Sequence, residues 1–235
     1  MLSLYLREND LETARLSFQS RRVAKISHIM PRVIDISGSI GPDRDKAEAF
    51  IKSVFNDAYH AEISVSYPYL ISVSNHEGEI LAAAGFRYAH KEPVFLEQYT
   101  QAPIEQELSR LYGEDIARRD IAEIGSLASV GGGASVFLFA ALASYLDFKQ
   151  VQYTVVTGTR DLHRHLKMLG LQPQKICDAG QQQLQGSADN WGSYYTTSPC
   201  VLAGSVRDGV KSLQRTLGSV YENQIPFHYY TGKLS

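Results

Sequence analysis

The residues that could do chemistry gather around one strand-like segment and the glycine-rich turn after it. Residues 121–146 read IAEIGSLASVGGGASVFLFAALASYL, an apolar stretch, three glycines and then a helix-like stretch. A strand that ends in glycines and opens a helix presents unpaired backbone N–H groups and a positive helix terminus to one point. Glycine also removes the side chains that would block close approach. We therefore expect Gly131–Gly133 to bind a phosphate or pyrophosphate, with tight strand-to-helix packing as the alternative.

Two carboxylates are candidates for a general base. Glu123 lies in the otherwise apolar strand that ends at the glycines, so partial desolvation would move its pKa toward a useful value. The alternative is a structural carboxylate bonded to a neighbouring arginine. Glu97, in the stretch FLEQY, is the second candidate, and its alternative role is to pack or to cap a helix.

Aromatic residues supply the candidate substrate pocket. Trp191, Tyr194 and Tyr195, in the stretch WGSYY, form a wall with polar tips. We expect Trp191 and Tyr194, together with Tyr99 and Phe55, to contact substrate, and the hydroxyl of Tyr195 to serve catalysis. Core packing with one hydrogen-bonded hydroxyl is the alternative for these rings.

Several common sites are excluded. Asp161, His163 and His165 invite a metal site, but helical residues two apart point to different sides, so we expect no metal. The glycines lack the Lys-Ser/Thr of a Walker loop and the spacing of the dinucleotide motif. The sequence contains no G-x-S-x-G motif, which argues against a serine lipase.

Composition limits the partners and the compartment. The chain has 235 residues, 44% hydrophobic and 20% charged, with a formal net charge of -2. No global basic field therefore favours nucleic acid or anionic lipid. The longest apolar run, within 133–146, is shorter than the roughly 20 residues that cross a bilayer, so no stable membrane insertion is expected. No secretory signal is visible at the N-terminus, and we expect a cytoplasmic protein.

Hydrophobic periodicity predicts an α/β protein with a mixed sheet. Residues 41–63 predict an amphipathic helix, and residues 69–89 a β-hairpin around the turn Asn75–Gly78. Residues 93–120 have helical character. The strand from residue 121, the apolar helix, a strand over 151–159 and a helix over 160–170 form a βαβα unit, which implies parallel pairing.

Three regions are expected along the chain. Residues 1–40 are polar and moderately basic, and we expect a solvated N-terminal arm. Residues 41–205 form the main domain, and residues 206–235 a C-terminal helix and tail.

The order of these elements resembles the GNAT acyltransferase fold, a mixed central β-sheet flanked by helices. In that fold the pantetheine arm of an acyl carrier lies beside a splayed strand, and its pyrophosphate binds the loop after that strand. The resemblance places the pantetheine beside Ile124, Gly125, Ser126, Leu127, Ala128 and Ser129. It places the phosphate on Val130, Gly131, Gly132, Gly133 and Ala134. The usual loop begins with Gln or Arg where Ser129 or Val130 stands, and a common tyrosine is replaced by Leu166.

A closer resemblance spans about residues 45–205. The blocks FIKSVFNDAYHAEI, GEILAAAGFRYA, FLEQYTQAPIE, AEIGSLAS, GGG and WGSYYTTSPCVLAG, in this order, are similar to the bacterial thermostable hemolysin family. The core of that family resembles GNAT enzymes and acyl-homoserine-lactone synthases. In those synthases an arginine follows Glu-x-Ser, whereas Gly125-Ser126-Leu127 stands here, so lactone synthesis is not implied.

These resemblances imply an N-acyltransferase. We expect an acyl-CoA or acyl-carrier-protein thioester as the donor, a small-molecule amine as the acceptor, and an acyl carrier protein as a possible partner. One alternative is a membrane-active hemolysin, and another is a catalytically inactive module that binds acyl carriers. Acyl chain length, acceptor identity and oligomeric state stay open.

Overall fold

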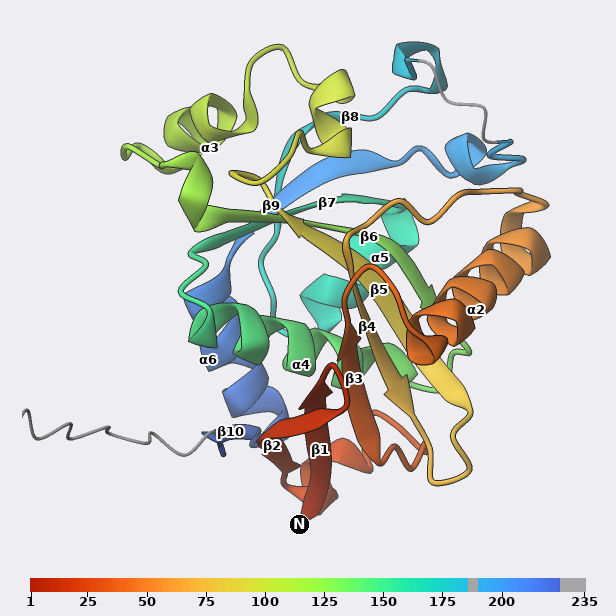
Figure 1. Ribbon diagram of the computed structural model, residues 1–235. Coiled ribbons are helices and arrows are strands. Elements are labelled where there is room, and N and C mark those ends of the chain that lie inside the picture. Colours follow the sequence, from red (N-terminus) through yellow and green to blue (C-terminus); the bar gives the residue numbers. More distant parts are fainter. Residues whose placement is uncertain (186–189, 225–235) are drawn as a thin grey trace, which may run out of the picture.

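The centre of the protein is a ten-stranded mixed β-sheet with helices on both faces (Figure 1). The computed structural model describes residues 1–185 and 190–224. Within these ranges the strand order is β10-β2-β1-β3-β4-β5-β6-β7-β9-β8. The strands are β1 Leu2–Glu8, β2 Leu11–Phe18, β3 Val33–Ser37, β4 Tyr69–Ser74, β5 Ile80–Tyr88, β6 Ile121–Ser129, β7 Tyr153–Gly158, β8 Gln174–Asp178, β9 Cys200–Ser205 and β10 Val220–Asn223.

The helices divide between the two faces of this sheet. The longer ones are α2 Pro42–Tyr59, α3 Ile104–Tyr112, α4 Ala134–Phe148, α5 Arg160–Met168 and α6 Val206–Leu217, and α1 Ser20–Val23 is a single turn. Helices α4 and α6 lie side by side on one face, whereas α2 packs against β3, β4, β5 and β6 on the other (Figure 1). Alternation along β5 explains the division, because Ala82 and Ala84 contact the α4 side and Ala83 the α2 side.

The expectation of a solvated N-terminal arm over residues 1–40 is wrong. Strands β1, β2 and β3 belong to the central sheet, and β3 connects them to β4. Leu4, Leu6, Leu16 and Phe18 are fully buried against the α4 side. Alternation of apolar and polar residues in LSLYLRE is the strand signal, and the basic cluster around Arg21 and Arg22 had obscured it.

The central part of the chain follows the predicted elements. The amphipathic helix, the hairpin of β4 and β5, and the βαβα unit from β6 to α5 are all present. Strands β6 and β7 pair in parallel, as the crossover through α4 requires. In the helical region 93–120, Pro103 precedes α3 and Gly113 follows it in the left-handed conformation. Short 3-10 helices, Phe95–Tyr99 and Arg118–Asp120, flank α3.

The C-terminal region contains the expected helix, α6. A short strand, β10, follows it, pairs with β2 and forms one edge of the sheet. The expected tail over residues 225–235 lies outside the described residues. Within the described residues no helix is both long enough and apolar enough to cross a membrane.

Candidate active site

The site forms where strands β6 and β7 separate. Their parallel pairing covers only the first four residues of β6 and ends at the pair Ile124–Val156, yet β6 continues to Ser129. On its other side β6 stays paired with β5, and a β-bulge interrupts the register there. At this bulge Ser126 has φ of 48°, a left-handed value that is rare for a residue with a side chain. The backbone of Gly125–Ser129 therefore faces an opening instead of a neighbouring strand.

A cleft of about 320 Å³ fills this opening and has walls from both faces of the sheet. Ser135, Phe139, Leu162 and His165 line it from α4 and α5. The opposite side is aromatic and comes from α2 and from segments before β4, β6 and β9, with the lining residues Phe55, Tyr59, Tyr67, Phe95, Tyr99, Trp191, Tyr194 and Tyr195. The cleft thus connects the two faces of the sheet through the gap between β6 and β7.

The triple glycine lies between Ser129 and Ser135, which both line the cleft, and has the geometry of an anion-binding turn. Gly131, Gly132 and Gly133 all have positive φ, of 87°, 59° and 84°. Among the described residues, the N–H groups of Gly132, Gly133 and Ser135 have no hydrogen-bond acceptor. They lie at the positive N-terminus of α4, so a phosphate fits this turn.

Packing is a second reason for these glycines. A Cβ atom at Gly133 would overlap the backbone oxygen of Ile26 and the side chain of Ser27. The hydroxyl of Ser27 also donates to the Gly132 carbonyl at 3.0 Å. Packing therefore accounts for Gly133, and phosphate binding at this turn stays a prediction.

The structure brings the predicted aromatic residues together. The hydroxyls of Tyr99 and Tyr195 are hydrogen bonded at 2.6 Å, although the residues are 96 positions apart. Trp191 packs on Tyr194, and Tyr194 stacks on Phe55 with 6.1 Å between ring centroids. Burial raises the pKa of Tyr99 and of Tyr195, so both hydroxyls stay protonated at neutral pH.

Two buried polar atoms near this wall lack partners. Within residues 1–185 and 190–224, Trp191 Nε1 and Thr157 Oγ1 are buried and make no hydrogen bond. Both residues line the cleft. Because buried polar groups are normally paired, these two atoms mark where a polar ligand would complete the site.

Glu123 is buried beneath the aromatic wall. Its side chain is 1% exposed, accepts N–H bonds of 2.9 Å from Phe95 and Leu96, and lies 3.2 Å from Arg87 Nε. Burial raises its pKa to about 7, against the lowering effect of Arg87 and of the two N–H groups. Both interpretations from the sequence have a counterpart here, because the carboxylate forms an ion pair with an arginine and its pKa is raised to about 7.

Glu97 has a structural environment. Arg118 makes two bonds to its carboxylate, of 2.5 and 2.9 Å, and the N–H of Ile104 at the start of α3 donates to it at 3.0 Å. Burial alone would raise the pKa of Glu97, but these bonds outweigh burial and lower it. Neither its carboxylate nor that of Glu123 lines the cleft, so the two differ in partners and in pKa rather than in access. This geometry matches the alternative of packing and capping rather than a general base.

Most residues predicted beside the pantetheine do line the cleft. These are Ile124, Gly125, Ser126, Leu127 and Ser129. Ala128 instead points into the core on the α2 side and is 1% exposed, and Ala134 is fully buried. Val130 lies outside, 56% exposed. Period-two alternation explains Ala128, which belongs to the opposite face of β6 from Leu127.

Two features of the cleft were not predicted. The side chain of Tyr67 lies across β5 and β6, against Gly85 and Gly125. These two glycines leave room for the ring, but they are neighbours only because of the strand register, which the sequence alone does not show. His165 Nε2 lies 3.1 Å from Ser135 Oγ, and burial lowers the pKa of His165, so the ring is neutral at pH 7.

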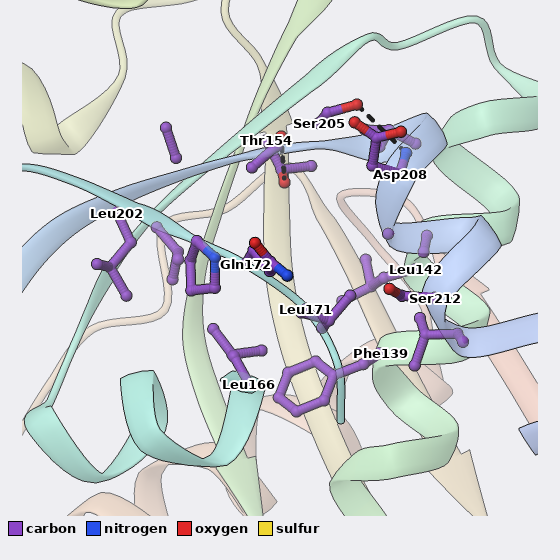
Figure 2. A pocket seen from close by; sticks show the side chains of 18 of the residues that line it. Phe139, Leu142, Thr154, Leu166, Leu171, Gln172, Leu202, Ser205, Asp208 and Ser212 are labelled. Carbon is purple, nitrogen blue, oxygen red and sulfur yellow. Dashed lines mark hydrogen bonds between the residues drawn. The ribbon is translucent and has the colours of Figure 1, made fainter. Parts of the chain in front are cut away.

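A second, apolar cavity of about 430 Å³ adjoins the cleft (Figure 2). The two share four lining residues, Ile124, Leu127, Phe139 and Leu162. Figure 2 shows Phe139, Leu142 and Leu166 among the side chains that line it, together with the polar residues Gln172, Asp208 and Ser212. The shared walls make the cavity a continuation of the cleft on the α4 side of the sheet.

Sequence comparison identifies the family. A sequence model described as thermostable hemolysin matches residues 37–210, well over half of the chain. The chain belongs to the thermostable hemolysin family. This confirms the closer of the two resemblances found in the sequence. No curated protein is similar enough in sequence to be matched to this member of the family.

Solved structures with a similar fold include two synthases. One is FeeM, an N-acyl amino acid synthase from uncultured soil microbes, with a TM-score of 0.53 and 16% identity over 77% of this chain and 99% of that one. Another is BjaI, a CoA-dependent acyl-homoserine lactone synthase, with SAM and isopentyl-CoA; it gives a TM-score of 0.54 and 10% identity over 79% and 89%. At these identities the likeness shows a shared fold, and the predicted mixed sheet flanked by helices is confirmed.

Proposed function

We propose that this thermostable hemolysin family member is an N-acyltransferase. It moves an acyl group from a thioester, carried by CoA or by an acyl carrier protein, to the amine of a small molecule. The cleft through the sheet between β6 and β7 carries the proposal, because it joins an apolar cavity to an aromatic pocket and is lined by Ser129 and Ser135, on either side of the glycine turn. The similar structures are described as an N-acyl amino acid synthase and a CoA-dependent acyl-homoserine lactone synthase, which supports this chemistry.

The donor binds along β6. Its phosphate lies on the N–H groups of Gly132, Gly133 and Ser135, a group shared by CoA and by the phosphopantetheine of a carrier protein. The amides of the pantetheine arm pair with the backbone of Gly125–Ser129, as an added strand pairs with a free edge. The acyl chain enters the apolar cavity between α4, α5 and α6. These three subsites hold the thioester close to the point where the strands separate.

The acceptor binds on the aromatic side. Tyr99, Trp191, Tyr194 and Tyr195 enclose it, and Trp191 Nε1 supplies a buried donor that has no partner among the described residues. An acceptor with a hydrogen-bond acceptor group, such as a carboxylate or carbonyl, suits that indole N–H. The amine then approaches the thioester from the face opposite the acyl chain.

Glu123 manages the proton of the acceptor. The amine nitrogen attacks the thioester carbonyl carbon, the new C–N bond forms, the C–S bond breaks, and the thiolate leaves. The amine proton passes through water to Glu123, which is buried on the α2 face of β6 two residues before Gly125 and does not itself line the cleft, and the thiolate takes a proton from solvent. A pKa near 7 lets the carboxylate accept a proton at neutral pH and release it afterwards.

Thiol release tests the proposal. Purified protein is incubated with acyl-CoAs of graded chain length, and separately with the same acyl groups on a carrier protein, together with a panel of amino acids and other small amines. Free thiol is followed by a thiol reagent, and the N-acyl product by mass spectrometry. We expect amine-dependent thiol release and a product heavier than the amine by the acyl group.

A pair of variants tests the donor subsite. Gly132 has φ of 59°, which Asn and Asp tolerate better than other residues with side chains, and a Cβ there meets only the flexible end of Ile29. Gly132→Asp adds a negative charge at the phosphate site, whereas Gly132→Asn adds nearly the same shape without charge. We expect the Asp variant to lose donor binding far more than the Asn variant.

The outcomes separate the alternatives. Donor binding without thiol release for any amine would refute catalysis and support a binding module. Equal donor binding by the Asp and Asn variants would refute the phosphate site. Leakage of liposomes at full rate without any thioester would support the membrane-active hemolysin and overturn the proposal.

A further inference from the structure

Tyr67 lies across two strands of the sheet at the point where the cleft opens. Gly85 on β5 and Gly125 on β6 are register partners, and a Cβ atom on either would overlap the Tyr67 side chain. At Gly85 that Cβ would meet the ring, and at Gly125 it would meet the hydroxyl. The two glycines therefore make a groove for this ring, and the groove directs the hydroxyl to Gly125.

Two buried arginines hold Tyr67 in this position. Arg44 donates to the Tyr67 carbonyl at 2.8 Å, and the guanidinium of Arg87 lies 4.5 Å above the centroid of the ring. Arg87 also contacts Glu123, at 3.2 Å. Tyr67, Arg87 and Glu123 thus form one layer on the α2 face of β6, and the position of the hydroxyl is set before any ligand binds.

The Tyr67 hydroxyl is available to a ligand. Tyr67 is only 7% exposed, yet it lines the cleft, and no residue in 1–185 or 190–224 makes a hydrogen bond with its hydroxyl. A phenolic O–H at the wall of a cleft can donate to a ligand, so an acceptor atom beside Gly125 would complete its hydrogen bonding. In the proposed function, which this inference deepens and on which it rests, the reacting thioester lies at that position.

We propose that the hydroxyl of Tyr67 donates a hydrogen bond to the thioester carbonyl oxygen and to the oxyanion that forms there. When the amine attacks, the C–N bond forms and the carbonyl π electrons move to oxygen, where the Tyr67 O–H stabilises the charge. When the oxyanion collapses, the C=O bond returns and the C–S bond breaks. Tyr67 keeps its proton throughout, so no proton balance depends on it.

The chemistry of the hydroxyl favours this role over protonation of the leaving thiolate. Burial, and to a smaller extent the neighbouring Glu123, raises the pKa of Tyr67 well above its usual value of 10. A free thiol has a pKa of about 8.5, so transfer of this proton to a thiolate would run uphill. A hydroxyl that stays protonated at neutral pH is a suitable hydrogen-bond donor to the oxyanion.

The test is Tyr67→Phe, which removes only the hydroxyl and keeps the ring in the glycine groove. The control is Tyr69→Phe, because Tyr69 is also a tyrosine beside β5, stacks on Phe86 at 5.2 Å, and contacts Lys91 outside the cleft. Two quantities are measured for the wild type and both variants: kcat and KM for thiol release, and the infrared stretching frequency of a ¹³C-labelled acyl-CoA carbonyl bound without acceptor. Thermal unfolding checks that each variant folds.

The expected result has two parts. Tyr67→Phe lowers kcat by about 10²-fold with little change in KM, as loss of one oxyanion donor does. It also shifts the bound carbonyl to higher frequency, toward that of free acyl-CoA, while Tyr69→Phe changes neither quantity. The frequency readout needs no acceptor, so it tests Tyr67 even if the correct amine is unknown.

The contrary results are distinguishable. If acyl-CoA binds and Tyr67→Phe leaves both the carbonyl frequency and kcat unchanged, the role of Tyr67 is overturned while the proposed function stands. If the wild type binds no acyl thioester, the proposed function fails and the role of Tyr67 fails with it. A fall in kcat without any change in carbonyl frequency would assign Tyr67 to another step.

Discussion

A single substitution in β9 tests whether the apolar cavity holds the acyl chain. Gly204 lines this cavity, and a Cβ atom there would meet only Thr154 Oγ1, at 3.9 Å. A side chain at Gly204 therefore enters the cavity without forcing the backbone to move. Valine suits a strand position, so Gly204→Val should fold and place three additional carbons inside the cavity.

The magnitude follows from the volume that the new side chain takes. Each buried methylene contributes about 0.8 kcal/mol, which corresponds to about a fourfold change in affinity. Wild-type kcat/KM should therefore rise about fourfold for each carbon of the acyl chain until the cavity is full. With three carbons displaced, the longest well-bound donor should lose about 2.4 kcal/mol, or about 60-fold in kcat/KM.

The assay is kcat/KM for thiol release across acyl-CoAs that increase in chain length, with one amine held constant. We expect the rise with chain length to stop about three carbons earlier in Gly204→Val than in the wild type. Gly204→Ala, with one added carbon, should give a change of about fourfold for the longest donor. Short donors serve as the internal control and should change little in either variant.

One result would refute this reasoning directly. If Gly204→Val folds, as judged by its thermal unfolding, and keeps the wild-type profile of rate against chain length, the acyl chain does not occupy this cavity. Uniform loss at every chain length would instead indicate damage to the cleft.

Two further predictions concern the carboxylates. Because a base must be ionised, kcat/KM should rise with pH through about 7, the raised pKa of Glu123. Glu123→Gln should abolish this rise and lower kcat by about 10²-fold or more. If the rise with pH persists in Glu123→Gln, another group is the base. Glu97→Gln should leave kcat unchanged and lower stability by about 1 kcal/mol at pH 7, since it weakens the bond to Arg118 and the cap on α3. The pKa of Glu97 is lowered by folding, so its contribution to stability is present above the unfolded pKa and is lost as pH falls through the folded pKa. Equal unfolding temperatures for Glu97→Gln and wild type at pH 7 would contradict this stabilising role.

Local patterns in the sequence were sufficient for the central elements. The 3.6-residue period of residues 41–63, the hairpin around Asn75–Gly78 and the βαβα unit all depend on neighbours within one segment. The N-terminal strands were missed although their alternation is regular, because nearby basic residues suggested a solvated arm. Their place beside β4 depends on pairing across distant parts of the chain, which no local window contains.

For the candidate site, the sequence by itself determined which kinds of residue were available, and the tertiary structure decided what each could do. Glu97 and Glu123 were both plausible bases, and only burial and partners distinguish a carboxylate neutralised by Arg118 from one that titrates near neutrality. Tyr67 had no motif, because its position depends on two glycines brought into register across neighbouring strands. Helical and strand periods are properties of adjacent residues, whereas desolvation, strand separation and cavity shape arise only when distant segments pack together.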